Sequence, residues 1–355
     1  MGNFTFKGLF LAGLFMVLGC LSIQAADDDL ITRQVTVKVY EAGTLSEKIA
    51  YNKMYKITNL KIIGEINGTD LRVIREMAGK DVWGKDTDGM LSVLDLSDAK
   101  IVEGGDYYNY YENLTGRYGC STSNDKIGNY AFEGCSGLTS ITLPSGVTSI
   151  GDSAFSGCIG LTSITLPSGV TKIGNYAFSS CRGLTSLTLP SGVTEIGEGV
   201  FWECIGLTSL TLPSGVTWIG SSTFKGCIGL TSITLPSGLT EICGSAFSGC
   251  SGLTSIYVYT EKLPKMGVNV FDGCDAKKCT VYVPKGTYDD YWLSEFGYFE
   301  NIVEFDPTGI NNVITSNDAK ELSRYSLNGQ RLSAPTKGLN IVKYSDGSVK
   351  KVVVQ

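Results

Sequence analysis

Apolar positions recur at fixed offsets through the middle of the chain, with a period of 23 residues. Near-identical copies start at Leu138, Leu161, Leu184, Leu207 and Leu230. In the second copy the apolar positions are Leu161, Ile164, Leu166, Val170, Ile173, Ala177, Phe178 and Cys181. These side chains are expected to share one inward face, while the hydroxyl residues between them face outward.

A single copy is too small to fold alone. Ordering its backbone costs about 1–2 kcal/mol per residue, which offsets the burial of its apolar side chains. Stacked copies cover each other's open faces, so the period predicts a solenoid with atypical caps at both ends. The Leu-x-x-Ile-x-Leu start is typical of a leucine-rich-repeat strand, and the Pro-Ser-Gly after it ends the strand. We therefore expect a leucine-rich-repeat solenoid with one short parallel strand per turn.

Three motifs follow one another in every copy: Leu-x-x-Ile-x-Leu-Pro, Val-x-x-Ile-Gly and Ala-Phe-x-x-Cys. This order resembles the BspA-like class of bacterial leucine-rich repeats, and the resemblance covers Ile127 to about Phe271. It implies a surface protein that binds host matrix proteins or other bacteria.

The composition narrows the function further. The chain has 355 residues, 44 of them glycine, a formal net charge of −6 and no histidine. The acidic balance argues against a nucleic-acid partner. Without histidine there is no Ser-His-Asp or Cys-His nucleophile and no His-ligated metal. We expect no enzyme, no metal and no cofactor.

Residues 1–25 resemble a signal peptide, because Lys7 precedes the apolar stretch 8–23 and Ala25 ends a small-residue cleavage site. A membrane anchor is an alternative, although the stretch is short for a spanning helix. The segment that ends in Leu18-Gly19-Cys20 also resembles a lipoprotein processing box, with Cys20 as the lipidated residue. The sequence predicts an exported protein, at the cell surface, in the outer membrane or secreted, with no later membrane span.

Six cysteines recur at the repeat period: Cys135, Cys158, Cys181, Cys204, Cys227 and Cys250. Neighbouring rungs of a parallel sheet lie about 5 Å apart. Stacked side chains point in parallel, however, and do not meet in a disulfide geometry. We expect a ladder of buried thiols that act as small hydrophobic side chains. The pairing of Cys120, Cys243, Cys274 and Cys279 is left open.

Residues 26–120 are predicted to form an N-terminal cap with degenerate leucine-rich repeats. The motif Leu91-x-x-Leu94-x-Leu96 follows the strand spacing of the repeats, and residues 58–66 are expected to form an earlier strand. Residues 69–78 carry apolar side chains at helical spacing after a Thr-Asp start, which predicts a short helix.

The segment Gly-Gly-Asp-Tyr-Tyr-Asn-Tyr-Tyr at residues 104–111 is the most unusual outside the repeats. Clustered tyrosines beside glycines suit a carbohydrate or protein contact surface. Tyr107, Tyr108, Tyr110 and Tyr111 are therefore candidate partner-binding residues. A loop that packs these rings against the first turn is the other interpretation.

Residues 121–305 are predicted to form the BspA-like repeat domain with its C-terminal cap. In this cap residues 280–284 read as a last strand, and residues 288–296 as a short helix that leads into residues 302–305. Residues 306–320 are polar and predict a linker.

Residues 321–355 alternate apolar side chains around Asn-Gly and Asp-Gly turns, which predicts a small antiparallel β module. Its motifs Leu-Asn-Gly-Gln-Arg and Lys-Gly-Leu-Asn-Ile-Val resemble the C-terminal sorting domain of type IX secretion. The resemblance implies transport across the outer membrane and onto the cell surface.

Partner recognition must come from outward positions. The sheet surface repeats Thr-Ser-x-Thr in every copy and is expected to be a uniform hydroxyl surface. The positions that vary between copies are expected in turns after the strand, and they make Lys172, Trp202, Trp218 and Lys225 further candidate partner-binding residues. Packing between neighbouring turns is the alternative role for the two tryptophans.

Two functions fit these patterns: a non-catalytic adhesion or protein-interaction protein, or a glycan-binding accessory protein that uses the aromatic residues. A carboxylate-based glycosidase is the only enzyme class left. The repeats give it no regular carboxylate pair, because Glu195 and Glu241 lie two copies apart.

Overall fold

The computed structural model describes residues 30–113, 115–306, 321–325, 331–335, 337–344 and 349–354. The predicted signal peptide 1–25, including Cys20, lies outside the described residues. So do residues 307–320 of the predicted linker.

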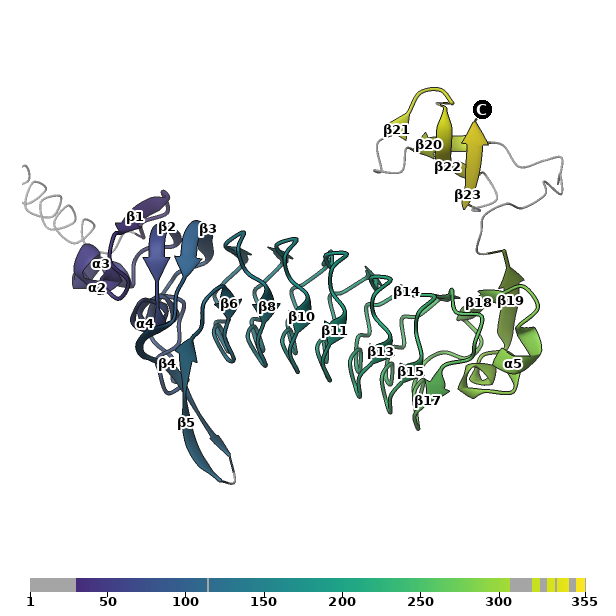
Figure 1. Ribbon diagram of the computed structural model, residues 1–355, viewed down its shortest axis with the longest axis horizontal. Helices are drawn as coiled ribbons and strands as arrows, with labels where there is room; N and C mark the ends of the chain where they lie inside the picture. The colour runs from purple at the N-terminus through teal and green to yellow at the C-terminus, as the bar shows by residue number, and fades with distance from the viewer. Residues whose placement is uncertain are drawn as a thin grey trace, which may run out of the picture.

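The repeats stack into an elongated solenoid, which confirms the predicted fold (Figure 1). One long side is the main sheet, in which all strands run parallel. Equivalent residues of successive copies lie opposite each other, as Ile141 and Ile164 do. The main-sheet strands within the repeats are β7 (Ser140–Thr142), β9 (Ser163–Thr165), β12 (Ser209–Thr211), β14 (Ser232–Leu235) and β16 (Ser255–Val258).

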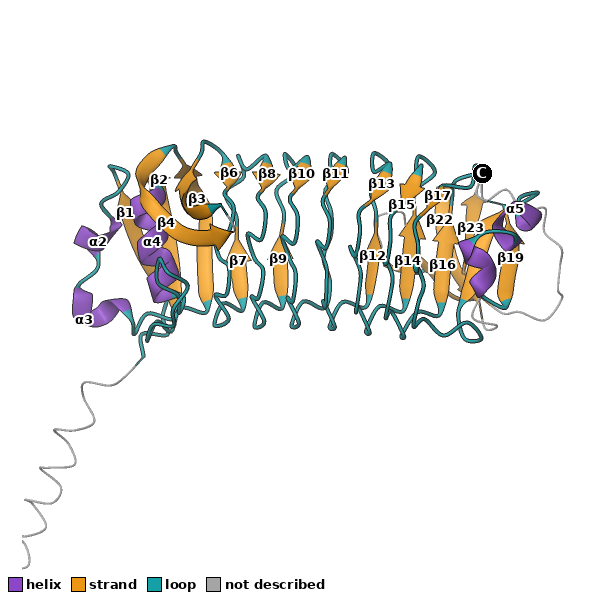
Figure 2. Cartoon of the chain, turned by 90° about the horizontal axis from the view of Figure 1, so that it is seen from below, coloured by secondary structure: helices purple, strands orange, loops and turns teal. Residues whose placement is uncertain are grey.

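A second row of very short parallel strands runs along another side of the solenoid (Figure 2). Lys172 and Trp218 lie in these strands, and not in the turns where the variable positions were expected. In this second ladder an exposed or half-buried residue is followed by a more deeply buried one, as in Lys172 and Ile173. Its strands are β6 (Lys126–Ile127), β8 (Ser149–Ile150), β10 (Lys172–Ile173), β11 (Glu195–Ile196), β13 (Trp218–Ile219), β15 (Glu241–Ile242) and β17 (Lys265–Met266).

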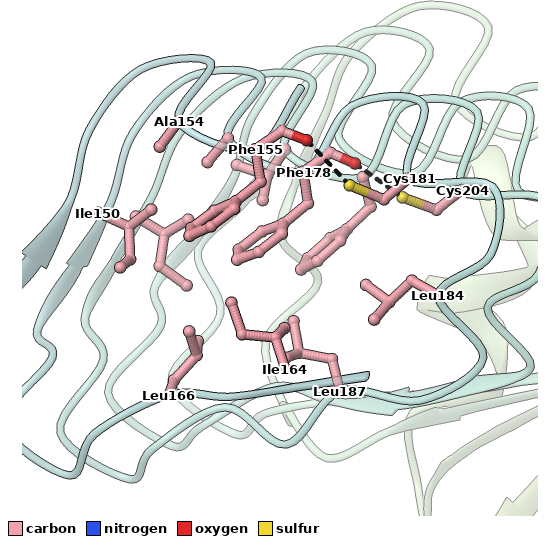
Figure 3. Packing of buried hydrophobic residues seen from close by; sticks show 14 of the residues in the cluster. Ile150, Ala154, Phe155, Ile164, Leu166, Phe178, Cys181, Leu184, Leu187 and Cys204 are labelled. Atoms are coloured by element: carbon pink, nitrogen blue, oxygen red, sulfur yellow. Dashed lines mark hydrogen bonds between the residues drawn. The ribbon is translucent and has the colours of Figure 1, made fainter. Parts of the chain in front are cut away.

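Tight turns close the third side, which we call the turn face, and the core fills the space between the three sides. One phenylalanine per copy stacks on the next, with ring centroids 5.3 Å apart for Phe155 and Phe178 (Figure 3). Ladder thiols such as Cys181 lie beside this stack, and all six repeat-period cysteines are buried and free. The prediction of buried, unpaired thiols is confirmed.

The described cysteines outside the ladder are also free. Cys120, Cys274 and Cys279 are buried, and Cys243 is partly exposed. Cys274 extends the ladder, since its thiol donates a hydrogen bond to the Phe247 oxygen as ladder thiols do to theirs.

The backbone ladders are interrupted in one copy, at a place we call the seam. Residues 184–189 form no strand, so the main sheet stops at β9 and resumes at β12. The distance from the Thr185 nitrogen to the Thr162 oxygen is 3.5 Å, against 3.1 Å for the preceding pair. Leu187 and Leu210 both stand where the other copies have isoleucine, but Leu210 lies within strand β12, so this substitution alone does not account for the seam.

The N-terminal cap adds three longer strands to the main sheet and covers its end with helices. The predicted helix starts one residue early, at Gly68, because Asn67 and not Thr69 caps it; Asp70 completes a capping box. The cap elements are β1 (Val35–Val39), α2 (Leu45–Lys48), α3 (Tyr51–Met54), β2 (Asn59–Ile66), α4 (Gly68–Met77) and β3 (Val93–Ile101).

The C-terminal cap contains one more strand than predicted. Strand β18 (Thr280–Pro284) is not the last, because β19 (Asn301–Phe305) pairs with it in parallel. Between them lie α5 (Tyr288–Trp292) and the 3₁₀ helix η1 (Glu295–Tyr298), in place of a single helix. Phe296 and Phe299 pack against Phe271 and close the phenylalanine stack.

The C-terminal β module is antiparallel, as predicted. Its strands are β20 (Glu321–Tyr325), β21 (Arg331–Leu332), β22 (Gly338–Tyr344) and β23 (Val349–Val354). The Asn-Gly and Asp-Gly pairs that predicted its turns lie outside the described residues.

Candidate functional site

The tyrosine-rich segment forms a β-hairpin, whereas the second interpretation of this segment expected a loop. Strands β4 (Gly104–Asn113) and β5 (Gly116–Thr122) pair antiparallel and project from the cap beside β6 (Figure 1). Gly116 lies at a φ of +140°, which favours glycine, and permits the tight reversal of the chain. The hairpin thus presents its side chains next to the second ladder.

Tyr108 holds the hairpin to the first repeat. Its side chain is fully buried, and its hydroxyl donates a 2.8 Å hydrogen bond to the Asn129 oxygen. Burial raises the pKa of this phenol well above its usual value. The fully buried Tyr108 ring offers no exposed surface, and the partner-binding role of this residue stays a prediction.

A buried arginine from the cap helix α4 fixes the same junction. Arg75 donates from Nη1 to the oxygens of Tyr130 and Ala131, at 2.7 and 3.1 Å. Asn109 of the hairpin donates to the Tyr130 oxygen and to Glu133, both at 3.4 Å. Burial raises the pKa of Glu133, and the nearby Arg75 charge opposes this rise. Helical spacing places Arg75 on the same face as Leu71, four residues earlier, but the sequence analysis did not identify it as a buried residue.

Tyr111 links the hairpin and the solenoid on the outer side of this junction. Its ring stacks on Tyr118 of the opposite strand at 5.5 Å and on Tyr130 of the first repeat at 4.9 Å. The rings of these three residues form a continuous aromatic wall. It preorganises the hairpin relative to the second ladder.

The other hairpin aromatics form a separate cluster. Tyr110 stacks on Trp83 at 4.5 Å, and the guanidinium of Arg117 lies 5.0 Å from the centre of the Trp83 ring. Tyr107 lies edge-on to Tyr110 and is about half exposed. Trp83 and Arg117 were not predicted, because neither belongs to a repeat or to the tyrosine segment.

Between the hairpin and the second ladder runs a groove of about 880 Å³, which we call the hairpin groove. It continues along the ladder as far as Trp218 and so crosses several repeats. Its lining includes Tyr108, Tyr111, Gly119, Cys120, Ser121, Lys126, Asn129, Ser149, Asp152, Lys172, Asn175, Glu195 and Trp218.

The floor of the groove carries both signs of charge. Lys172 and Glu195, neighbours on the ladder, form an exposed ion pair of 2.9 Å. A regular row of amides and carboxylates borders it: the Asn129 side chain accepts from the Asp152 nitrogen at 2.9 Å, and Asp152 accepts from the Asn175 nitrogen at 2.7 Å. This row holds successive turns in register.

Trp218 ends the groove. Its indole Nε1 donates to the Cys243 thiol at 2.9 Å, and the ring is partly buried. Trp202 and Lys225 lie on the turn face and do not line the groove. The structure therefore brings Tyr111, Lys172 and Trp218 into one surface, and it leaves Trp202 and Lys225 elsewhere.

The hydroxyl surface of the main sheet is partly structural. The first threonine of several copies donates its hydroxyl to the preceding turn, as Thr162 does to the Thr139 oxygen at 3.1 Å. Within the described residues no cluster of His, Cys, Asp and Glu could hold a metal ion. No helix in the same part of the chain has the length and apolar character to cross a membrane.

The parallel strands, the 23-residue turns and the internal phenylalanine and cysteine ladders define a leucine-rich-repeat solenoid. The family model for the BspA type leucine rich repeat region matches six copies, over residues 106–228, 171–294 and 217–332. The chain belongs to this family.

Several solved structures are similar to the chain. A T. pallidum leucine rich repeat protein is 36% identical, over 43% of this chain and 71% of that one, with a TM-score of 0.41. A leucine rich cell surface protein of Faecalibacterium prausnitzii is 29% identical, over 62% of this chain, with a TM-score of 0.41. The match spans 51% of the F. prausnitzii chain, about half its length. No curated protein matches the chain.

Proposed function

We propose that the chain is an exported, non-catalytic surface protein that binds partner proteins in the hairpin groove. The observation that carries this proposal is the groove, in which the variable ladder residues Lys172, Glu195 and Trp218 lie beside the aromatic wall of the hairpin. The scaffold around them is constant from copy to copy. Variable side chains on a rigid repeat scaffold suit recognition of a partner.

The partners that we propose are host matrix proteins or surface proteins of other bacteria, in line with the BspA-like family. Partly buried aromatic rings and a rim of mixed charge are the composition of a protein interface. Tyr111 and Trp218 supply the rings, and the Lys172–Glu195 pair supplies both charges.

A glycan-binding accessory protein is the second candidate. The observation in its favour is the row of Asn129, Asp152 and Asn175 along the groove between the two aromatic residues. Planar polar side chains and aromatic rings also suit sugar hydroxyls and sugar faces. The two candidates use the same groove and differ in ligand.

The route to the surface is part of the proposal. Residues 1–25 would direct export, with lipidation of Cys20 as the alternative anchoring route. Residues 26–120 and 121–305 would form the cap and the repeat domain, joined through the linker 306–320 to a sorting module at 321–355. Its antiparallel strands are compatible with that role.

The test is a binding screen of the full chain against matrix proteins, bacterial surface proteins and a glycan array. Lys172→Glu reverses a charge in the groove, and Lys225→Glu makes the same change on the turn face as the matched control. The proposal predicts a protein ligand whose affinity falls about tenfold or more with Lys172→Glu only. Binding to glycans alone would favour the second candidate. A ligand sensitive only to Lys225→Glu would place the contact on the turn face and overturn the groove.

A further inference from the structure

A row of exposed residues crosses six consecutive turns on a side of the solenoid away from the groove. Each of these residues follows a buried cysteine and stands in the loop that leads into a main-sheet position. We call this row the edge stripe. It consists of Ser136, Ile159, Arg182, Ile205, Ile228 and Ser251.

Three of the six residues of the edge stripe are isoleucines with exposed side chains. Ile159 and Ile228 are each 52% exposed, and Ile205 is 38% exposed. The equivalent residues at both ends of the stripe are serines, so the apolar character is confined to the middle. Exposed apolar side chains that line up over several turns mark an interaction surface.

The order of residues in the edge stripe is nearly the same in both directions. Read from either end, serine comes first and isoleucine second. A two-fold axis between Arg182 and Ile205 therefore places Ser136 on Ser251 and Ile159 on Ile228 of a second copy. Such self-complementarity is what an isologous interface requires.

Arg182 and Ile205 are the two positions that differ when the stripe is read in opposite directions, and a nearby opposite charge compensates for this difference. The axis places Arg182 of each copy on Ile205 of the other, where the aliphatic stem of arginine can cover the isoleucine. Glu203 stands two residues before Ile205 and already reaches Arg182 of its own chain at 2.7 Å. The opposite charge that the second copy's arginine needs is thus present beside the apolar contact.

The spacing of the rungs also favours a second copy over other partners. Six rungs at about 4.8 Å cover about 24 Å, and only a partner with the same rise keeps every side chain in register. A second solenoid of the same sequence has this rise by construction. The charge of Arg182 and Glu203 disfavours burial in lipid.

We infer that the chain forms an antiparallel dimer through the edge stripe, with the two-fold axis between the turns that carry Arg182 and Ile205. None of the stripe residues lines the hairpin groove. The dimer therefore holds two grooves free, one per copy and running in opposite directions. The inference does not depend on which ligand the groove binds.

Sedimentation velocity of the full chain over a wide concentration range tests the dimer. We expect self-association, and we expect Ile205→Asp to weaken it by about tenfold or more, as for a central interface residue. Thr165→Asp is the matched control, because it adds the same charge at an exposed position of the main sheet. A full chain that stays monomeric, or a dimer that tolerates Ile205→Asp, overturns the inference.

Reversing the charges of Arg182 and Glu203 one at a time distinguishes an ion pair between two copies from the ion pair within one chain. Arg182→Glu and Glu203→Arg should each dissociate the dimer, since each faces like charge across the axis. An equal mixture of the two variants should restore a heterodimer, because each supplies the charge that the other lacks. Circular dichroism of each variant confirms the fold. If the mixture of the two variants associates no better than either variant alone, the proposed two-fold axis is wrong.

Discussion

The thiol of Cys181 donates a hydrogen bond to the main-chain oxygen of Phe155, with 3.1 Å between sulfur and oxygen (Figure 3). The same bond joins Cys204 to Phe178 at 3.0 Å, and it recurs along the ladder. Each bond crosses from one turn to the preceding one. Cysteine is therefore required for its S–H group as well as for its size.

Replacement of Cys181 by alanine removes this bond and leaves a small cavity. We expect Cys181→Ala to lower the free energy of unfolding by about 1–3 kcal/mol. Thr165→Ala is the control at an exposed position of the main sheet, and we expect it to change the free energy of unfolding by less than about 0.5 kcal/mol. Urea denaturation followed by circular dichroism measures both. Equal losses would show that the ladder bond contributes nothing.

Thiol labelling checks the burial of the ladder. Burial raises the pKa of the Cys135 thiol to about 11 and that of Cys227 to about 12. These thiols stay protonated and unreactive at neutral and mildly alkaline pH. We expect Cys243 to be alkylated first among the described cysteines, as read by peptide mapping of the folded protein. Rapid alkylation of Cys135 or Cys227 without denaturant would contradict the core assignment.

The inward and outward faces of a repeat can be compared directly. Phe201 is fully buried in the phenylalanine stack, and Thr188 is exposed. Phe201→Ala should cost about 3–5 kcal/mol through the cavity it leaves. Thr188→Ala should change stability by less than about 0.5 kcal/mol. Similar values from chemical denaturation would mean that the two faces are misassigned.

The repeats were predictable because every inward position recurs in phase, so Phe178 and Cys181 could be placed by comparing copies. The hairpin groove was only partly predictable. Lys172 and Trp218 stood out as variable positions, but their distance from Tyr111 depends on how the hairpin docks. That docking depends on Arg75 and Asn109. Both lie outside the repeats, so comparison of copies could not identify them.

The partly buried carboxyl of Glu133 at the hairpin junction predicts a pH dependence. Burial raises the pKa of Glu133 above its ordinary value of 4.5. Because the folded protein favours the protonated carboxyl, protonated Glu133 contributes its full stability below pH 4.5. This contribution to the free energy of unfolding is lost as the pH rises through the pKa of the folded state. Glutamine does not ionise and so avoids this loss. We therefore expect the stability of Glu133→Gln, compared with that of the wild type, to be more favourable at pH 7 than at pH 4. Urea midpoints at the two pH values measure this difference. No change between them would mean that Glu133 ionises without cost.

The seam should be visible as a local weakness. Its long hydrogen bonds, 3.5 Å to Thr185 and 3.3 Å from the Thr208 nitrogen to the Thr185 oxygen, contrast with 2.8 Å for Thr231. We expect the Thr185 and Thr208 amides to exchange with deuterium faster than the Thr231 amide. The turn face is continuous at this copy, where the Phe178 nitrogen bonds to the Val200 oxygen at 2.9 Å, and serves as the internal control. Equal exchange rates at the Thr185, Thr208 and Thr231 amides would show that the seam is not a local weakness.

The most direct test of the hairpin groove is hydrogen exchange of the full chain with and without a protein ligand from the binding screen. The groove assignment predicts slower exchange on binding in β5 and in the ladder strands β8 and β10, which line the groove. It predicts no change in the main-sheet strands β9 and β14. Protection confined to the main sheet, with β5, β8 and β10 unaffected, would contradict the groove as the binding site.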